Sequence, residues 1–512
     1  MATVALKSAA GKWLMASTIL ASSMAFIDAT ALNVVLPALQ QGLKATGADL
    51  FWILNAYLLM LASLILIGGA MGDKLGRRKV FMCGIFIFIL GSAACGISGS
   101  VLMLVVCRVL QGIGGALMIP GSLSLISSSI NPNERGKAIG TWSAFTTVVT
   151  MGGPVLGGAL ADAGLWRYIF FINVPIGVIA LLMLAFKVNE IRDEDNKAGL
   201  DFGGAITIAL ALALITFGFL RVPSVGLSNI QAYGSLAGGL ILLLIFIIIE
   251  IKSSNPMMPL KLFNNSTFSG ANLLTFFLYA GLGAGMLFLS LNLVQIQGYT
   301  QLQSGLTFLP FTVLMISIAR FAGALADKHG PRLFLIVGPA LAGSGLLLLS
   351  FVKQTAGPAA YWTTFFPGVL VLGLGMSFTV APLTATVMAS VSDHFSGTAS
   401  GINNAMTRIS GVFANAIFGA LAVLFFSTAL QQNLQHTSFT TTDIQLIVSQ
   451  AKNLGNAKVP PILSTGKQQV ETYFHEAFIS AYANIMRISA GLGYLGALMA
   501  LVFIRNKAIK KT

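Results

Sequence analysis

The chain has 512 residues, of which 56% are hydrophobic and only 9% are charged. Soluble globular proteins carry roughly a quarter of their residues as charged side chains, so this composition excludes a soluble fold and indicates helices that lie in lipid. The formal net charge of +14 would suit a nucleic-acid partner. No basic motif with interleaved aromatic residues accompanies that charge, so we expect no nucleic-acid binding.

Hydrophobic segments of spanning length recur along the whole chain. The hydrocarbon core of a bilayer is about 30 Å thick, so each spanning helix needs roughly 20 mainly apolar residues. Fourteen segments meet this requirement: 12–37, 50–70, 80–98, 101–126, 138–160, 168–187, 202–220, 232–251, 267–293, 305–326, 333–352, 364–391, 398–426 and 477–504. The sequence therefore predicts an all-α integral membrane protein with 14 transmembrane helices.

An even number of spans places both termini on the same side of the membrane. The loops on that side hold most of the basic residues, among them Lys74, Arg77, Arg78, Lys79, Arg135, Lys137, Arg505, Lys507, Lys510 and Lys511. Basic loops are retained on the cytoplasmic side. The first segment is too long and too polar for a signal peptide. We therefore expect a multi-pass protein of the inner (plasma) membrane with both termini in the cytoplasm.

The residues that usually carry enzyme chemistry are scattered. Cys83, Cys95 and Cys107 lie inside predicted helices and offer neither a disulfide framework nor metal-ligand spacing. The four histidines lie in loops or at helix ends without a common motif. There is no phosphate-binding loop. We expect no metal, no cofactor and no enzymatic activity.

A basic loop occurs twice. Residues 68–79 read GGAMGDKLGRRK, and a degraded copy, GALADKHGPR, occupies residues 323–332. The equivalent aspartates, Asp73 and Asp327, are 254 residues apart. Such a repeat indicates duplicated halves, a common construction of transporters. The candidate gate residues in these loops are Gly69, Asp73, Gly76, Arg77, Arg78, Gly323, Asp327, Gly330 and Arg332.

A second repeat pairs residues 158–160 with residues 419–421, both Gly-Ala-Leu. Both repeats advance the helix number by eight, where two six-helix halves alone would give six, so two helices are inserted between the halves. We predict an N-terminal half at 1–188, a cytoplasmic hinge at 189–201, the inserted pair at 202–251 and a C-terminal half at 252–512. The polar stretch 427–476 is expected to be a solvated extracytoplasmic loop, with room for one amphipathic helix near 444–454.

Asp28 and Arg108 are charged residues deep in predicted helices. A charge at mid-membrane costs around 2.5–3.5 kcal/mol on insertion scales, so each needs a partner or a function. Counted from the outer helix ends, their depths differ by about 3 Å at 1.5 Å per residue, so they can meet. One interpretation is a static ion pair. The other is a proton site, because desolvation favours the protonated acid and Arg108 favours the ionised one.

Two further clusters have a physical interpretation. Pro154 removes a helix hydrogen bond, and glycines beside it leave a flat face for a neighbouring helix, which gives either tight packing or a seal. The members of this cluster are Gly153, Pro154, Gly157 and Gly158. In the basic loop, Asp73 can accept from a helix N-terminus of the other half. Arg77 or Arg78 can pair with Glu134, or can serve topology alone.

Polar residues in the predicted helices mark a candidate substrate cavity. They are Asn33, Gln111, Asn292, Gln295, Asn403, Asn404, Arg408 and Arg487. The helices of the second half show no mid-membrane acid, which argues against dicationic substrates. A cavity rich in apolar side chains with few polar groups suits amphiphilic compounds.

Five segments resemble one known family. They are Gly69–Arg78, Phe26–Pro37, Arg108–Gly112, Gly153–Gly158 and Trp166–Pro175. They are similar to the motifs of the fourteen-helix drug:proton antiporters of the major facilitator superfamily, and they follow one another along the chain as those motifs do. The resemblance implies a monomeric exporter that works by alternating access and draws on the proton gradient. It implies that Asp28 and Arg108 couple protons and that the Gly153 cluster seals the outer end in the inward-open state.

Alternatives remain open at this point. The same fold could export an endogenous lipid-like or anionic metabolite. A membrane sensor or enzyme is a more remote possibility. The expected partners are small amphiphilic substrates, protons and the lipid bilayer, with a periplasmic adaptor as an open question.

Overall fold

The computed structural model describes residues 4–131, 134–188, 201–254, 256, 258–391, 396–435, 437, 439–461 and 466–505. In this part of the chain the secondary structure is helical apart from one isolated bridge between Val4 and Ile130. The first half of the chain forms α1 (Ala9–Leu43), α2 (Gly47–Leu75), α3 (Arg77–Gly96), α4 (Val101–Ser129), α5 (Arg135–Asp162), α6 (Tyr168–Phe171), α7 (Asn173–Lys187), α8 (Phe202–Val225) and α9 (Ile230–Lys252).

The second half of the chain begins with a short 3-10 helix, η2 (Leu260–Asn264). The α-helices that follow are α10 (Ser266–Gln295), α11 (Gln301–Leu306), α12 (Leu309–His329), α13 (Arg332–Leu349), α14 (Phe365–Ala389), α15 (Ser396–Leu434), α16 (Thr441–Ser449) and α17 (Lys467–Phe503). The 3-10 segments η3 (Pro358–Ala360) and η5 (Gln450–Asn456) lie between them.

The predicted membrane architecture is confirmed. Among the described residues, 13 helices are long and apolar enough to cross a bilayer. The remaining predicted span, 138–160, lies within α5, which is 28 residues long. Two predicted spans are each divided near one end, 168–187 into α6 and α7 and 305–326 into α11 and α12.

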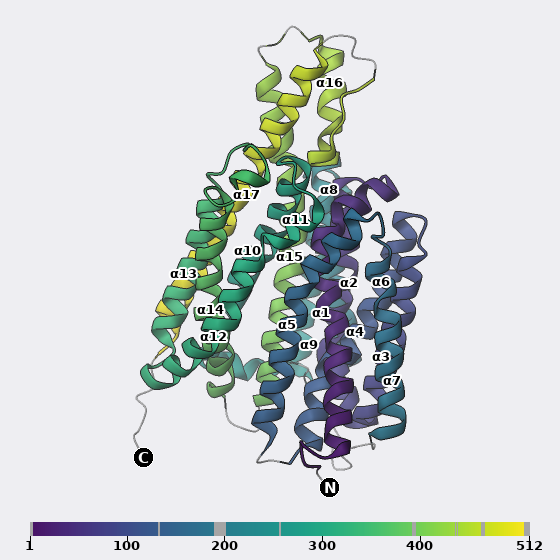
Figure 1. Cartoon of the computed structure of the whole chain (residues 1–512), viewed down its shortest axis with the longest axis vertical. Helices are drawn as coiled ribbons and strands as arrows, with labels where there is room; N and C mark the ends of the chain where they lie inside the picture. Colours follow the sequence, from purple (N-terminus) through teal and green to yellow (C-terminus); the bar gives the residue numbers. More distant parts are fainter. Residues whose placement is uncertain are drawn as a thin grey trace.

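The helices form two halves that stand side by side (Figure 1). Helices α1–α7 pack with one another, as do α10–α17, and the inserted pair α8–α9 lies against α2 of one half and α15 of the other. The start of α1 and the end of α17 lie at one end of the bundle, here called the proximal end (Figure 1). The opposite end, here called the distal end, carries α16.

The two basic loops occupy equivalent places in the two halves. In each loop a glycine directly follows the end of a helix, Gly76 after α2 and Gly330 after α12. Their φ angles are 110° and 90°, a backbone conformation that glycine adopts without the clash a Cβ would bring. The duplication inferred from sequence therefore extends to the backbone geometry of the turn.

The polar stretch 427–476 departs from its prediction. We expected a solvated loop, but α15 continues to Leu434 and α17 begins at Lys467, so both helices extend beyond the bundle (Figure 1). The helices α16 and η5 lie between them, where one amphipathic helix was foreseen. The loop prediction was wrong because hydropathy reports burial in lipid, whereas polar residues form helices equally well in water.

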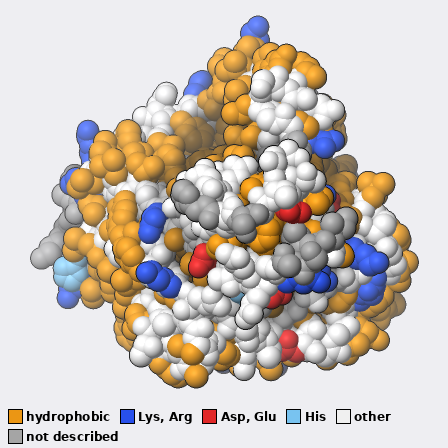
Figure 2. All heavy atoms as spheres, turned by 90° about the horizontal axis from the view of Figure 1, so that it is seen from above, with side chains coloured by type: hydrophobic (Ala, Val, Ile, Leu, Met, Phe, Trp, Pro, Cys, Tyr) orange, Lys and Arg blue, Asp and Glu red, His pale blue; other side chains and the backbone are white. Residues whose placement is uncertain are grey.

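The outer surface suits a lipid environment. Seen end-on, hydrophobic side chains make up most of the rim, whereas polar and charged side chains gather toward the middle (Figure 2). Large exposed apolar residues on the outer helices include Phe186, Leu102 and Phe321, at 76%, 74% and 72% exposure. Such a continuous apolar surface on a folded protein requires a lipid or protein partner.

Candidate coupling site and distal seal

Asp28 and Arg108 meet in the interior of the first half. Asp28 lies in α1 and Arg108 in α4, and Arg108 Nη1 donates to Asp28 Oδ2 in a salt bridge. Each side chain is only 1% exposed. The predicted pairing is therefore present, but the pair is buried within the half instead of facing an open cavity. Two opposite charges compensate each other in this low-dielectric setting, where either charge alone would be costly.

Gln111 completes the site. It follows Arg108 by three residues on α4, so both side chains occupy the same face of the helix. Its Nε2 donates to Asp28 Oδ1 over 2.9 Å, and its Oε1 accepts from Arg108 Nη1 over 2.8 Å. Both carboxylate oxygens of Asp28 thus have a donor. We expected Gln111 in the substrate cavity, but it is fully buried and belongs to this network.

A second layer of polar contacts surrounds the site. Arg108 Nε donates to the carbonyl of Ile53 on α2, over 3.3 Å. Gln111 Nε2 lies 3.4 Å from the hydroxyl of Ser92 on α3, and Asn173 of α7 donates to the same hydroxyl over 3.0 Å. The network therefore joins α1, α2, α3, α4 and α7. A change in the charge of Asp28 would be felt by five helices.

Tyr57 is a part of this site that our sequence analysis missed. Its ring lies under the guanidinium of Arg108, 4.4 Å from Cζ to the ring centroid. Tyr57 is 1% exposed, and its hydroxyl has no hydrogen-bond partner among the described residues. Tyr57 thus belongs to the buried surroundings of the coupling pair.

The Gly153 cluster packs α5 tightly against α1. A Cβ at Gly157 would approach the carbonyl of Ala31 to 2.7 Å, and one at Gly153 would overlap the side chain of Thr30. Pro154 cannot donate to the carbonyl four residues earlier, that of Thr150. The hydroxyl of Thr30 lies 3.0 Å from that carbonyl and 2.8 Å from the Phe26 carbonyl of its own helix, so its one proton is shared between the two acceptors.

The same cluster also contacts the second half. Gly158 lies against the backbone of Gln301 and Leu302 at the start of α11, where a Cβ would overlap the Gln301 carbonyl. Asp162, the last residue of α5, accepts from the backbone N–H groups of both residues, over 2.7 and 2.9 Å. A carboxylate at a helix N-terminus is favoured by the exposed N–H groups and the helix dipole. The halves are therefore closed against each other at the distal end.

A second distal contact joins the halves through amide side chains. Gln40 of α1 accepts from Gln295 of α10 over 3.0 Å and from Asn456 of η5 over 2.8 Å. We expected Gln295 in the substrate cavity, but the structure places it in this distal cluster. These amide hydrogen bonds between the halves add to the closure.

The basic loops fasten helices within their own half. Arg78 Nη2 donates to the carbonyl of Ala185 in α7, over 2.7 Å, and Arg77 Nη1 to that of Ser124 over 3.4 Å. Glu134, the expected partner of these arginines, instead accepts from the backbone N–H of Leu6 over 2.8 Å. Arg332 donates to the carbonyl of Leu501 in α17 over 2.8 Å.

The other gate residues are placed in part. Gly69 faces Pro120 of α4, and its counterpart Gly323 faces Ala381 of α14. The side chains of Asp73 and Asp327 lie outside the described residues, as does the predicted hinge at 189–200. The gate roles of these aspartates stay predictions.

Three of the residues predicted to line the substrate cavity lie near one another on α15. Asn403 Nδ2 donates to Thr275 Oγ1 over 2.7 Å and to Asn272 Oδ1 over 3.2 Å. Arg408 lies five residues farther along α15, is half-buried, and forms no ion pair with another described residue. Asn404 is exposed beside them. These residues give the second half a polar, cationic surface.

Three other cavity candidates lie elsewhere. Asn33 is half-buried in α1, and Asn292 is fully buried in α10, with no exposed surface in this conformation. Arg487 is exposed on α17 and donates to Asn484 over 3.3 Å. It shares a helical stripe with the exposed residues Tyr494 and Leu498, on a helix that packs only against its own half. The cavity assignment fails for Arg487 because a sequence gives depth in a helix but not its facing side.

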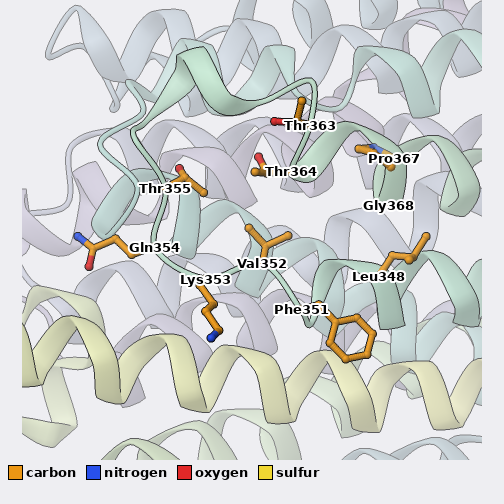
Figure 3. Close-up of a pocket in the computed structure, with 10 residues that line it drawn as sticks. All are labelled: Leu348, Phe351, Val352, Lys353, Gln354, Thr355, Thr363, Thr364, Pro367 and Gly368. Atoms are coloured by element: carbon orange, nitrogen blue, oxygen red, sulfur yellow. The ribbon is translucent and has the colours of Figure 1, made fainter.

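A separate hollow lies at the distal ends of α13 and α14 (Figure 3). It has a volume of about 450 Å³ and is lined by Lys353, Thr355, Thr363, Thr364 and apolar neighbours. The side chains of Phe351 and Lys353 point away from the threonines in this view (Figure 3). The hollow shares no residue with the coupling site.

Comparison with known proteins places the chain in a family. The sequence pattern of the Major Facilitator Superfamily matches residues 18–415. The tetracenomycin C resistance and export protein of Streptomyces glaucescens is 32% identical over 398 residues, covering 78% of this chain and 73% of that protein. The multidrug transporter protein MdtP of Bacillus subtilis is 30% identical over 413 residues, covering 80% and 74%.

Solved structures agree on the fold. A bacterial homologue of the human lysosomal transporter Spinster, in an inward-facing and unoccupied conformation, matches with a TM-score of 0.66 at 17% identity, covering 97% of this chain and 98% of that one. The D-xylose–proton symporter matches with a TM-score of 0.58 at 14% identity, covering 97% and 98%. With the sequence match across most of its length, the chain is a transporter that belongs to the Major Facilitator Superfamily.

Proposed function

We propose that the protein is a proton-coupled exporter of hydrophobic or amphiphilic compounds that works by alternating access. The buried network of Asp28, Arg108 and Gln111 is the observation that carries this proposal. An ionisable pair in the middle of a membrane protein marks an ion or proton pathway more often than a structural contact. Relatives whose names describe resistance, export and multidrug transport support the direction of transport.

The coupling step follows from how Asp28 is held. When ionised, its carboxylate accepts from Arg108 and Gln111, which fixes α1 against α4. A proton on Asp28 removes the charge that compensates Arg108 and leaves that guanidinium buried without a counter-ion. The protonated state is therefore expected to favour a different packing of α1 and α4. Because the two protonation states favour different packing, binding of a proton shifts the conformational equilibrium.

The distal contacts supply the other element that alternating access needs. In the described conformation α5 is closed on α11 through Gly158 and Asp162. These contacts involve few side chains, so the surface can separate without unpacking a core. We infer that this surface opens when the transporter faces outward.

Polar residues on α15 of the second half indicate the substrate class. Arg408 is half-buried there, and Asn403 and Asn404 lie five and four residues before it on α15. A cation beside amide groups favours substrates that carry an acceptor or an anionic group as well as an apolar body. The same observation keeps export of an endogenous anionic or lipid-like metabolite as the second candidate function.

The remaining parts of the proposal concern setting. We expect the protein in the plasma membrane with its proximal end in the cytoplasm, because the basic loops gather there. We expect it to act as a monomer and to need no cofactor beyond the proton gradient. A periplasmic adaptor is not required by any feature described above.

Transport by purified protein in liposomes with an imposed pH gradient tests the function. The wild type should concentrate an amphiphilic dye against its gradient, and Asp28→Asn should abolish this while downhill exchange remains. Arg108→Lys should recover only part of the activity lost in Arg108→Ala, because an ammonium cannot reproduce the planar fork of arginine. Asp443→Asn, which alters a half-buried acid in α16, is the matched control. Uphill transport by Asp28→Asn would reduce the pair to a structural contact.

A further inference from the structure

A long apolar groove runs along the outer side of α1, away from the coupling site and the seal. Its floor is formed by α1 residues such as Met15, Ala16 and Ile19, and its walls by Phe145 of α5 and Ile176 of α7. Helices α5 and α7 both pack against α1, and the groove lies between them. Its volume is about 670 Å³.

The groove has the length of one lipid chain. It extends along α1 from Lys12 to Ile27, about 22 Å at 1.5 Å per residue. One leaflet contributes about 15 Å, half of the hydrocarbon thickness, so a single acyl chain and its glycerol end fit this length. Phe145 on the wall is 56% exposed, so the groove is accessible from the bilayer.

One end of the groove carries a positive charge and the other end is apolar. Lys12 is the charged residue that lines the groove among the described residues, and it lies at the proximal end of α1. The nearby acid, Glu134, is engaged by the backbone N–H of Leu6. At the other end the lining is apolar except for Ser23, which is 4% exposed and whose hydroxyl has no partner within the described part of the chain.

We propose that this groove binds one acyl chain of an anionic phospholipid, with the phosphate on Lys12. A cation at the mouth of an apolar groove, at headgroup depth, matches an amphiphile whose negative charge and chain are adjacent. The bound chain fills the space between α5 and α7 on the surface of α1. It thereby supports α5, the helix that carries Gly158 and Asp162 to the distal seal.

Native mass spectrometry of the delipidated full-length protein tests this proposal. Phosphatidylglycerol should bind at least tenfold more tightly than phosphatidylcholine with the same chains. Lys12→Glu should reduce the affinity for phosphatidylglycerol to that for phosphatidylcholine. Lys261→Glu, which changes an exposed proximal lysine outside the groove, should leave both affinities unchanged. Equal affinity for the two lipids in the wild type, or equal losses in the two lysine variants, would overturn the assignment.

The chain is tested separately from the headgroup. Ala16→Phe fills the floor of the groove and should weaken both lipids about tenfold. Leu20→Phe, one turn along α1, repeats this test in case one of the two variants folds poorly. The melting temperature of each variant without lipid shows whether it is folded. Unchanged lipid affinity in the folded variants would place the lipid elsewhere. Displacement of phosphatidylglycerol by an amphiphilic dye, one for one, would make the groove a substrate site and would contradict the lipid assignment.

Discussion

Arg78 and Arg332 hold equivalent positions in the two halves and make the same contact. Each begins or nearly begins a helix after a basic loop, and each donates Nη2 to the carbonyl two residues before the end of the last long helix of its half. The acceptors are Ala185 in α7, at 2.7 Å, and Leu501 in α17, at 2.8 Å. A guanidinium at a helix C-terminus satisfies a carbonyl that the helix leaves free and interacts favourably with its dipole.

Removing either arginine should destabilise its own half alone. Because both contacts are at exposed helix ends, Arg78→Ala and Arg332→Ala should each cost about 0.3–1 kcal/mol. The double variant should show the sum, since the two contacts share no partner. Thermal unfolding of the detergent-solubilised protein measures this, with Lys261→Ala as the control. A double variant no less stable than either single one would disprove the independence of the two contacts.

Tyr57 can act through its aromatic ring or through its hydroxyl, and two substitutions distinguish these roles. Its ring packs on Arg108, but its buried hydroxyl has no partner among the described residues, which costs roughly 1–3 kcal/mol. If the ring alone matters, Tyr57→Phe should transport as well as the wild type and unfold at a higher temperature. Tyr57→Leu, which removes the aromatic face from Arg108, should lose most proton-driven transport.

Dye uptake and melting temperature should be measured on both Tyr57 variants in parallel. Loss of transport in Tyr57→Phe, with its stability unchanged or increased, would show that the hydroxyl itself takes part in coupling. That result would contradict the role assigned to the ring.

Asp162 should control the balance between closed and open distal ends. Asp162→Ala removes the acceptor of two N–H groups at the start of α11. Because the carboxylate is exposed, the loss should be about 1 kcal/mol, which shifts the ratio of the two states roughly fivefold. Distances between spin labels across the distal end measure this shift. Asp443→Ala, at the N-terminus of α16, removes a similar capping acid that lies within one half and should leave the distances unchanged.

Cysteine labelling tests which way the bundle lies in the membrane. The native cysteines must first be replaced, because Cys83 is exposed. In that background Thr441→Cys, on α16, should react with an impermeant maleimide added to intact cells. Lys261→Cys, at the proximal end, should react only after the membrane is opened. The reverse pattern would invert the topology and would contradict export as the direction of transport.

The part of the site that depends on depth could be predicted from the sequence. The constant rise of a helix placed Asp28 and Arg108 at similar depth, and burial of charge required them to meet. The facing side of each helix was not predictable in the same way, since almost every side of these helices is apolar. Arg487 was therefore assigned to a cavity and found on the outside of α17, and Gln111 was assigned to a cavity and found beside Asp28.

Contacts between helices that are distant in the chain could not be predicted from the sequence either. Nothing in the local pattern around Tyr57 distinguishes a ring under a guanidinium from an ordinary core tyrosine. Likewise the motif around Gly153 predicted a flat helix face, but its partners, Thr30 on one side and Gln301 on the other, depend on the packing of the whole bundle.

The carbonyl of Thr150 has a mechanical consequence. Pro154 leaves it without a donor in its own helix, and the hydroxyl of Thr30 in α1 lies 3.0 Å away. That hydroxyl also lies 2.8 Å from the Phe26 carbonyl of α1, so its one proton is shared between the two helices. If α1 and α5 slid apart, the Thr150 carbonyl would lose this contact in a medium without water. Together with the close packing of Gly153 and Gly157 on α1, this contact should make the two helices travel as a single rigid body during each transport cycle. The shear plane must then fall on the other side of α5, where the described contacts to α11 include those of Gly158, Gly305 and the exposed carboxylate of Asp162.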